Sequence, residues 1–138
     1  MLVFFLIFGI MKIPSAAHEL KCYHTWMGAD GIARTRVKKN AVVTLEDARE
    51  NSILVNSFFV DEKFPLLIDS RGIQSISREA RAFFTANGRD TNTIAFAILI
   101  DSAVSKVVGN FFLGINKPAV STKLFLDEKE ALQWLRNL

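Results

Sequence analysis

Hydrophobic and polar positions alternate in two neighbouring segments of the N-terminal third of the chain. Residues 22–27 are largely aromatic or β-branched, and in residues 32–37 arginines alternate with Ala33, Thr35 and Val37. A period of two is typical of β-strands. The glycine-containing cluster Gly-Ala-Asp-Gly between the two segments is suited to a tight connection. The pattern therefore predicts a β-hairpin.

Four later segments carry hydrophobic residues three and four positions apart, the spacing of one face of an α-helix. Each follows a residue whose side chain can accept a hydrogen bond from the first helical turn. Thr44 with Asp47, and Asp127 with Glu130, have the spacing of a capping box. We expect the first helix to end near Asp61. The expected N-caps are Thr44, Ser77, Ser102 and Asp127.

Short apolar runs separate these helices. Residues 64–69 and 122–126 predict two strands, and residues 93–100 are apolar on both alternating faces, which is typical of a central strand covered on both sides. Strands joined by helical crossovers run parallel. The fold class is therefore α/β, with a mixed sheet made of an N-terminal β-hairpin followed by three βα units, in the order ββαβαβαβα.

The first ten residues are an uninterrupted apolar run. About 20 such residues are needed to cross a bilayer, so the run is too short. A secretory signal with a cleavage site at residues 15–17 is one interpretation, although no basic residue precedes the run. The others are a biological start at Met11, a loosely attached tail, a buried extra strand and a surface anchor. We treat residues 1–11 as an extension and residues 12–138 as a single domain.

Composition narrows the class of protein. The chain has 138 residues, 50% of them hydrophobic and 12 of them phenylalanine, which suits one folded domain. Its single cysteine, Cys22, excludes an internal disulfide and favours a reducing, cytoplasmic location. The net charge of +3 is small, and we expect no nucleic-acid partner.

Residues for catalysis are scarce. The two histidines, His18 and His24, lie near the N-terminus, and Cys22 stands two positions from His24 without a third group to orient the pair. The chain has no zinc-protease motif, no phosphate-binding Walker loop and no dinucleotide-binding glycine motif. We therefore expect a protein that is not an enzyme and that has no metal and no cofactor.

Polar residues gather where two predicted parallel strands end. Asp69 and Asp101 each end a strand, and ligands of open α/β sheets bind beyond the carboxyl ends of strands. This edge could bind a small polar ligand or a loop of a partner. A structural role is the alternative, with Asp69 paired to Arg71 and Asp101 capping the following helix. The candidate binding residues are Asp69, Ser70, Arg71, Ser75, Ser77, Asp101 and Ser102.

Gly109 lies inside the third predicted helix, where glycine costs about 1 kcal/mol relative to alanine. Ser105 and Gly109 are four positions apart and so share one helix face. Such a stripe of small residues lets another backbone approach. It indicates close packing on the protein's own sheet or, alternatively, contact with a partner or an apolar ligand.

The element order and residues 66–77 (LLIDSRGIQSIS) resemble the STAS fold of anti-sigma-factor antagonists. Residues 102–118 and 124–135 are similar to uncharacterised STAS/SEC14-like domains of bacteria. The resemblance covers about residues 23–138 as an ordering of elements. It implies a non-enzymatic regulatory or ligand-sensing module, and several members of the wider group associate as dimers.

The resemblance also implies a candidate phosphorylation site. In the antagonists the phosphorylated Ser or Thr follows an Asp at the start of the second helix, and the two corresponding places here hold Ser77 and Arg78. A phosphate on Ser77 would lie at a helix N-terminus beside Arg78 and Arg81. The alternative is that Ser77 is an N-cap and nothing more.

Two functions follow from these observations. The first is a cytoplasmic regulatory module that binds a protein partner, with a homodimer as one form. The second is a carrier of a small apolar ligand or lipid, which the phenylalanine content, the pair Phe111 and Phe112, and the SEC14-like similarity favour.

Overall fold

The structure is a computed structural model that describes residues 13–59, 61–87, 93–115 and 121–138. The sequence pattern also predicts that the second helix ends at Gly88 and the third at residues 116–118. These positions and residues 1–11 lie outside the described residues. The same holds for four side chains expected on the apolar faces of these two helices, Phe84, Phe111, Phe112 and Ile115.

Six of the described strands form one sheet in the order β1-β2-β3-β5-β7-β8. Its first three strands are antiparallel, and the pairs β3–β5, β5–β7 and β7–β8 are parallel. The hairpin and the parallel strands are therefore confirmed. The strands are β1 (His18–Glu19), β2 (Tyr23–Met27), β3 (Ala33–Val37), β5 (Phe64–Asp69), β7 (Thr93–Leu99) and β8 (Ser121–Phe125).

Three two-residue strands carry no periodicity that a sequence pattern could reveal. β1 pairs with β2, while β4 (Val42–Val43) and β6 (Ser75–Ile76) form a separate parallel pair. The sequence pattern predicts only loop for residues 70–76, and the structure shows that this segment contains the short strand β6. The small β4–β6 sheet fixes the chain that leads into the second helix.

Four helices lie within the described residues, and all four predicted N-caps are in place. At Thr44 the full capping box with Asp47 is present, and Asp127 accepts a hydrogen bond from the amide of Glu130. Ser77 and Ser102 accept from amides three positions on, at 3.0 and 3.2 Å. The helices are α2 (Leu45–Ser57), α3 (Arg78–Asn87), α4 (Ala103–Ile115) and α5 (Glu128–Arg136).

Helix α2 ends earlier than the expected Asp61. Phe58 is the C-cap, and the ring of Phe59 stacks on that of Phe64 with centroids 3.9 Å apart. Asp61 has a φ of 56°, which a right-handed helix does not allow. Packing of Phe59 onto the first residue of β5 thus replaces the last turn that the sequence pattern predicts.

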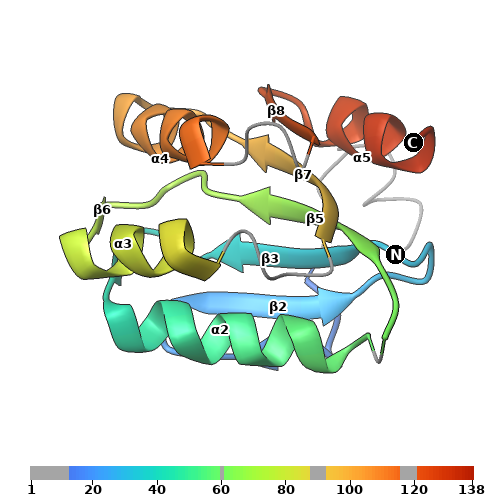
Figure 1. Ribbon diagram of the computed structural model, residues 1–138, viewed down its shortest axis with the longest axis horizontal. Helices are drawn as coiled ribbons and strands as arrows, with labels where there is room; N and C mark the ends of the chain where they lie inside the picture. Colours follow the sequence, from blue (N-terminus) through green and yellow to red (C-terminus); the bar gives the residue numbers. More distant parts are fainter. Residues whose placement is uncertain (1–12, 60, 88–92, 116–120) are drawn as a thin grey trace.

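The sheet has helices on both faces (Figure 1). Residues of α2, α3 and α4 pack in one hydrophobic cluster with Leu66, Phe96 and Ile98 of the sheet. Helix α5 packs in a second cluster against Leu67 and the small residues Ala95 and Ala97. The alternation along β7 between these two clusters explains why residues 93–100 read as apolar on both faces.

The small-residue stripe of α4 faces the protein's own sheet. Ser105 is fully buried, and a Cβ on Gly109 would lie 2.6 Å from the Cδ2 atom of Leu124 and 3.4 Å from Cγ2 of Ile100. The distance to Leu124 is shorter than the contacts that real Cβ atoms make, so the Leu124 side chain would have to shift. Close packing of α4 is therefore the reason for glycine at this position.

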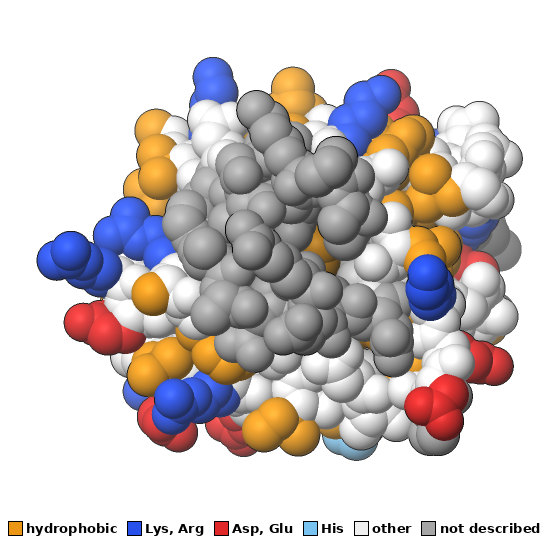
Figure 2. Space-filling model, in the orientation of Figure 1, with side chains coloured by type: hydrophobic (Ala, Val, Ile, Leu, Met, Phe, Trp, Pro, Cys, Tyr) orange, Lys and Arg blue, Asp and Glu red, His pale blue; other side chains and the backbone are white. Residues whose placement is uncertain are grey.

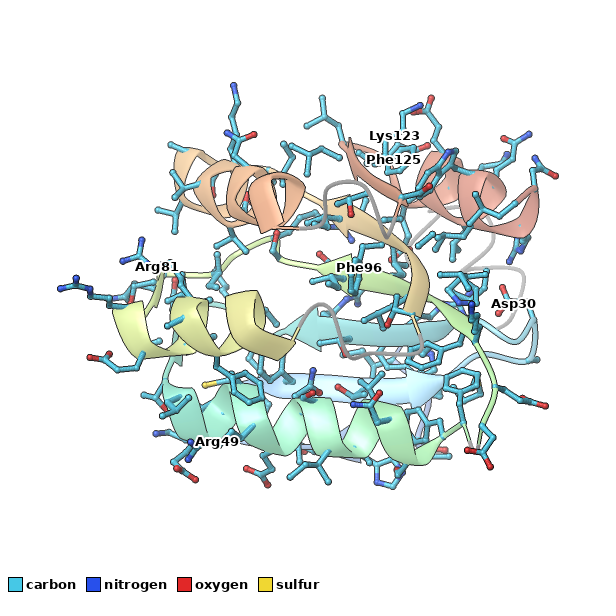
Figure 3. The ribbon with its side chains drawn as sticks, viewed as in Figure 1. Asp30, Arg49, Arg81, Phe96, Lys123 and Phe125 are labelled. Atoms are coloured by element: carbon cyan, nitrogen blue, oxygen red, sulfur yellow. The ribbon has the colours of Figure 1, made fainter. Side chains whose placement is uncertain are left out.

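Helix α5 is also tied to the sheet by charge at its C-terminal end. The carboxylate of Asp30, in the β2–β3 turn, accepts two hydrogen bonds from Arg34, at 2.8 and 2.9 Å, and further ones from Arg136. Arg34 is only 7% exposed. The Arg34 side chain is thus shielded from solvent and paired with Asp30. Figure 3 shows Asp30 at the end of the sheet opposite to Arg81.

Within the described residues, none of the helices has both the length and the apolar character needed to cross a bilayer.

Candidate functional site

The loops that follow β5 and β7 lie side by side, as the parallel topology predicts. The amide and hydroxyl of Ser70 both donate to the carbonyl oxygen of Leu99, at 3.1 and 2.6 Å. The amide of Gly72 donates to Oδ1 of Asp101 at 3.4 Å. The two loops meet at the edge where β3, β5 and β7 end, on the left in Figure 1. On the same side, Figure 2 shows Lys and Arg side chains gathered with some acidic ones.

Asp69 and Arg71 form a tight ion pair at this edge. Nε and Nη2 of Arg71 donate to the two carboxylate oxygens of Asp69 at 2.9 and 2.8 Å, and the Arg71 amide donates at 3.1 Å. Nε of Arg36 adds a bond of 2.9 Å. Asp69 is 4% exposed. Asp69 and Arg71 therefore form the structural ion pair that was the alternative to a binding role. The Asp69 carboxylate is too buried for a ligand to contact it.

A second carboxylate completes the group. Oε1 of Glu128, the first residue of α5, lies 3.2 Å from Nη2 of Arg36 and 3.6 Å from Nη2 of Arg71. We call Arg36 and Arg71 the arginine fork. Asp69 holds the fork from the sheet side and Glu128 lies across it from α5. Sequence reasoning missed Arg36 and Glu128. The one local indication was that Arg34 and Arg36 share one face of a strand.

The two carboxyl groups have opposite pKa shifts. Burial alone would raise the pKa of Asp69, but the hydrogen bonds and charge of Arg71, with the charge of Arg36, hold that pKa below its ordinary value. For Glu128, burial raises the pKa in spite of the nearby arginines, and the negative charge of Asp69 adds to this effect. The pair with Asp69 in turn raises the pKa of Arg71. Asp69 is thus the well-stabilised anion of the group and Glu128 the poorly stabilised one.

The serines of the predicted site differ in accessibility. Ser70 is 1% exposed and its hydroxyl is used within the fold. Ser77 is half-buried and caps α3, and Ser75 is exposed on β6. The N-cap role of Ser77 is therefore confirmed, while its phosphorylation stays a prediction.

The start of α4 contains a serine that the sequence reasoning treated only as small. The buried hydroxyl of Ser105 accepts hydrogen bonds from the amides of Asp101 and Ser102, both at 2.9 Å, while Ser102 caps the amide of Ser105. Asp101 and Ser102 themselves are exposed. We use the term rim for the five predicted residues that solvent reaches: Arg71, Ser75, Ser77, Asp101 and Ser102.

Cys22 and His24 are directed to different partners. The thiol of Cys22 donates to the carbonyl oxygen of Val42 at 3.5 Å, and His24 lies 3.9 Å from Glu19. Burial, followed by the hydrogen bond and charge of Asp47, raises the pKa of Cys22 to about 11. A thiol with this pKa is a poor nucleophile at neutral pH.

One apolar recess of about 230 Å³ opens beside the end of β2 that the two-residue β1 does not reach. It lies away from the rim, near the C-cap of α2. Its lining residues are Pro14, Ala16, His18, Trp26, Met27 and Phe58.

The protein has a STAS-like α/β fold. An uncharacterized protein from the DUF3478 family with a SpoIIAA-like fold, from Shewanella loihica PV-4, is similar with a TM-score of 0.61 and 17% sequence identity, over 88% of this chain and 99% of that chain. This likeness shows the fold alone, and it confirms the resemblance to STAS domains.

Residues 25–138 match the domain of unknown function DUF7793, and the chain belongs to this family. A protein with unknown function from Arthrobacter sp. FB24 is 33% identical over 83% of this chain and 92% of that chain, with a TM-score of 0.32. No curated protein matches the chain.

Proposed function

We propose that this protein is a non-enzymatic regulatory module of the STAS type that binds an acidic group of a protein partner through the rim. The observation that carries the proposal is the meeting of the β5–α3 and β7–α4 loops, which brings the loop that carries Arg71 beside the capped start of α4. Helix N-termini and guanidinium groups both favour an anion.

Arg71 is the residue best suited to contact the partner. Its side chain is 33% exposed while Asp69 fixes its direction, so that the guanidinium is both reachable and oriented. An oriented guanidinium loses less conformational entropy on binding than a free one. A cytoplasmic location and a homodimeric form are parts of the proposal that rest on the single cysteine and on the STAS resemblance.

The carrier of an apolar ligand is the second candidate, and the recess near β2 is the feature that favours it. Pockets that enclose a ligand usually measure roughly 300–1,000 Å³. The recess, at about 230 Å³, is smaller. The described residues therefore favour the interaction module over the carrier.

Native mass spectrometry of freshly purified protein separates the two candidates. A bound protein or a clean dimer supports the module, whereas a co-purifying lipid would support the carrier and contradict the proposal. The captured protein is then tested against the Arg71→Ala variant, which should capture less of it.

Arg49→Ala is the matched control for this experiment. Arg49 also pairs with a nearby carboxylate, but its side chain is 54% exposed on α2, and it lies outside the rim (Figure 3). Equal capture by wild type, Arg71→Ala and Arg49→Ala, with Arg71→Ala folded, would show that the rim is not the binding surface.

A further inference from the structure

We propose that the arginine fork is an oxyanion-binding site whose resident occupant is the Glu128 side chain, and that an external phosphate group binds there by displacing Glu128. This inference deepens the proposed function, because it names the chemistry that the rim recognises and an internal competitor for it.

The first argument is preorganisation of the fork. Arg36 lies opposite Asp69 in the parallel β3–β5 register, and Arg71 lies two residues beyond it. Asp69 accepts hydrogen bonds from Nε of both arginines, which holds the two guanidinium groups side by side. Their Nη2 atoms both point to one oxygen on the α5 side, Oε1 of Glu128. Two oriented guanidinium groups around one oxygen are the arrangement that proteins use for phosphate.

The second argument is charge. The two arginines of the fork carry two positive charges, and the carboxylates that pair with them are Asp69 on the sheet side and Glu128 on the α5 side. Asp101 also attracts Arg71, but its carboxylate is exposed and therefore screened by solvent. A phosphate dianion brings more charge and more acceptor oxygens than the Glu128 carboxylate, which suits donors that come from two arginines.

The third argument is that Glu128 can leave without loss of the helix. The N-terminus of α5 is capped by Asp127 through the amide of Glu130, and the Glu128 side chain takes no part in that cap. The Glu128 side chain is only 15% exposed in its present position, and burial disfavours its charged form there. Movement of this side chain into water would remove that cost and vacate the position that its Oε1 atom holds beside the two Nη2 atoms.

The site can be reached from solvent. The side chains of Arg36 and Arg71 are 22% and 33% exposed, compared with 6% for Asp69 beneath them. An incoming anion would therefore meet the Glu128 side of the fork and not the Asp69 side. The same chemistry would accept free phosphate or a phosphorylated side chain of a partner.

The test is titration of wild type, Glu128→Gln and Glu128→Ala with inorganic phosphate at low ionic strength, followed by the NMR signals of the arginine Nε–H groups. We expect both variants to bind phosphate at least about tenfold more tightly than wild type, within the usual range of coupling between two competing ligands. Arg71→Ala combined with Glu128→Gln should lose this binding. A phosphoserine peptide in a parallel titration shows which source of phosphate the site prefers.

Glu130→Gln is the control, because it removes the same charge from an exposed position on another side of α5. Equal phosphate affinity in Glu128→Gln and Glu130→Gln would mean that the gain in affinity comes from net charge alone, and it would overturn the inference. The inference would also be overturned if the Arg36 and Arg71 signals did not shift in any variant. If one Glu128 variant does not fold, comparison of the other variant with wild type still tests the inference. No partner protein is needed, so this test can fail while partner capture succeeds.

Discussion

The guanidinium group of Arg34 occupies the space that a side chain on Gly28 would need. A Cβ atom at Gly28 would lie 1.7 Å from Nη1 of Arg34 and 2.6 Å from Oδ1 of Asp30. Gly28 does not have a positive φ, whereas Gly31, three residues on, has a φ of 79°. Glycine is thus required at these two positions for different reasons, one steric and one conformational.

This difference gives a first prediction. Gly28→Ala should lower the free energy of unfolding by about 2 kcal/mol or more, because it displaces a buried arginine from its carboxylate. Gly31→Ala should cost only the strain of its backbone, about 1 kcal/mol, since nothing lies within 4 Å of the added Cβ. Urea denaturation of both variants measures the difference, and equal losses would contradict the steric explanation.

A second prediction concerns the pH dependence of stability. The pKa of Asp69 is below its ordinary value of 3.8, so ionised Asp69 stabilises the fold above that pH, and this contribution is lost as the pH falls through the lowered pKa. Asp69→Asn should cost about 3 kcal/mol at pH 7, because it leaves two arginines without their buried partner. The difference between wild type and variant should shrink below about pH 4. Urea titrations from pH 7 to pH 2.5 measure it, and a constant difference would contradict the role of Asp69.

A third prediction concerns the contribution of Arg71 to the stability of the fold. Arg71→Ala should cost about 1–2 kcal/mol, because Asp69 loses two charge-assisted hydrogen bonds but keeps Arg36. Arg71→Lys should recover part of this loss, since lysine keeps the charge but not the bidentate geometry. Thermal denaturation measures both variants. No loss in Arg71→Ala would mean that the pair with Asp69 does not stabilise the fold.

The fourth prediction tests the cap of α3. Ser77→Ala should cost about 1 kcal/mol by removing the acceptor for the Ala80 amide, whereas Ser77→Asp should keep most of the stability because aspartate is also a good N-cap. Ser75→Ala is the control: Ser75 is exposed, and this change should stay within about 0.5 kcal/mol of wild type. A large loss in Ser75→Ala would instead indicate that the Ser75 side chain stabilises the β4–β6 pair.

The fifth prediction concerns the N-terminal extension. A chain that begins at Met11 should unfold as cooperatively as the full chain and at the same temperature, because residues 1–10 precede every element that the sequence pattern predicts. A decrease of several degrees in the melting temperature would show that these residues add to the core.

The features that the sequence predicted correctly are those with a local cause. The alternation of residues 32–37 and the caps at Thr44 and Ser102 each act within a few positions, so one segment contains all the information needed. The parallel arrangement followed from helical connections, and the meeting of the Asp69 and Asp101 loops followed from it. The pair of Asp69 with Arg71 could also be predicted, because the two residues are only two positions apart.

The features that were missed depend on residues far apart in the sequence. Arg36 and Glu128 are separated by 92 positions, and Asp30 and Arg136 by 106. Neither pair has a pattern of its own, since charged residues on a strand or on the first turn of a helix are usually solvated. Only the packing of α5 on the sheet brings the two residues of each pair together.

The position of α5 along the chain has a consequence for biosynthesis. The sheet face that α5 covers is lined by Ile32, Leu67 and Ala97, which are all made long before residue 128. A nascent chain whose strands have paired before α5 has formed therefore exposes this hydrophobic face of the sheet. Incomplete chains with exposed hydrophobic surface aggregate or recruit chaperones.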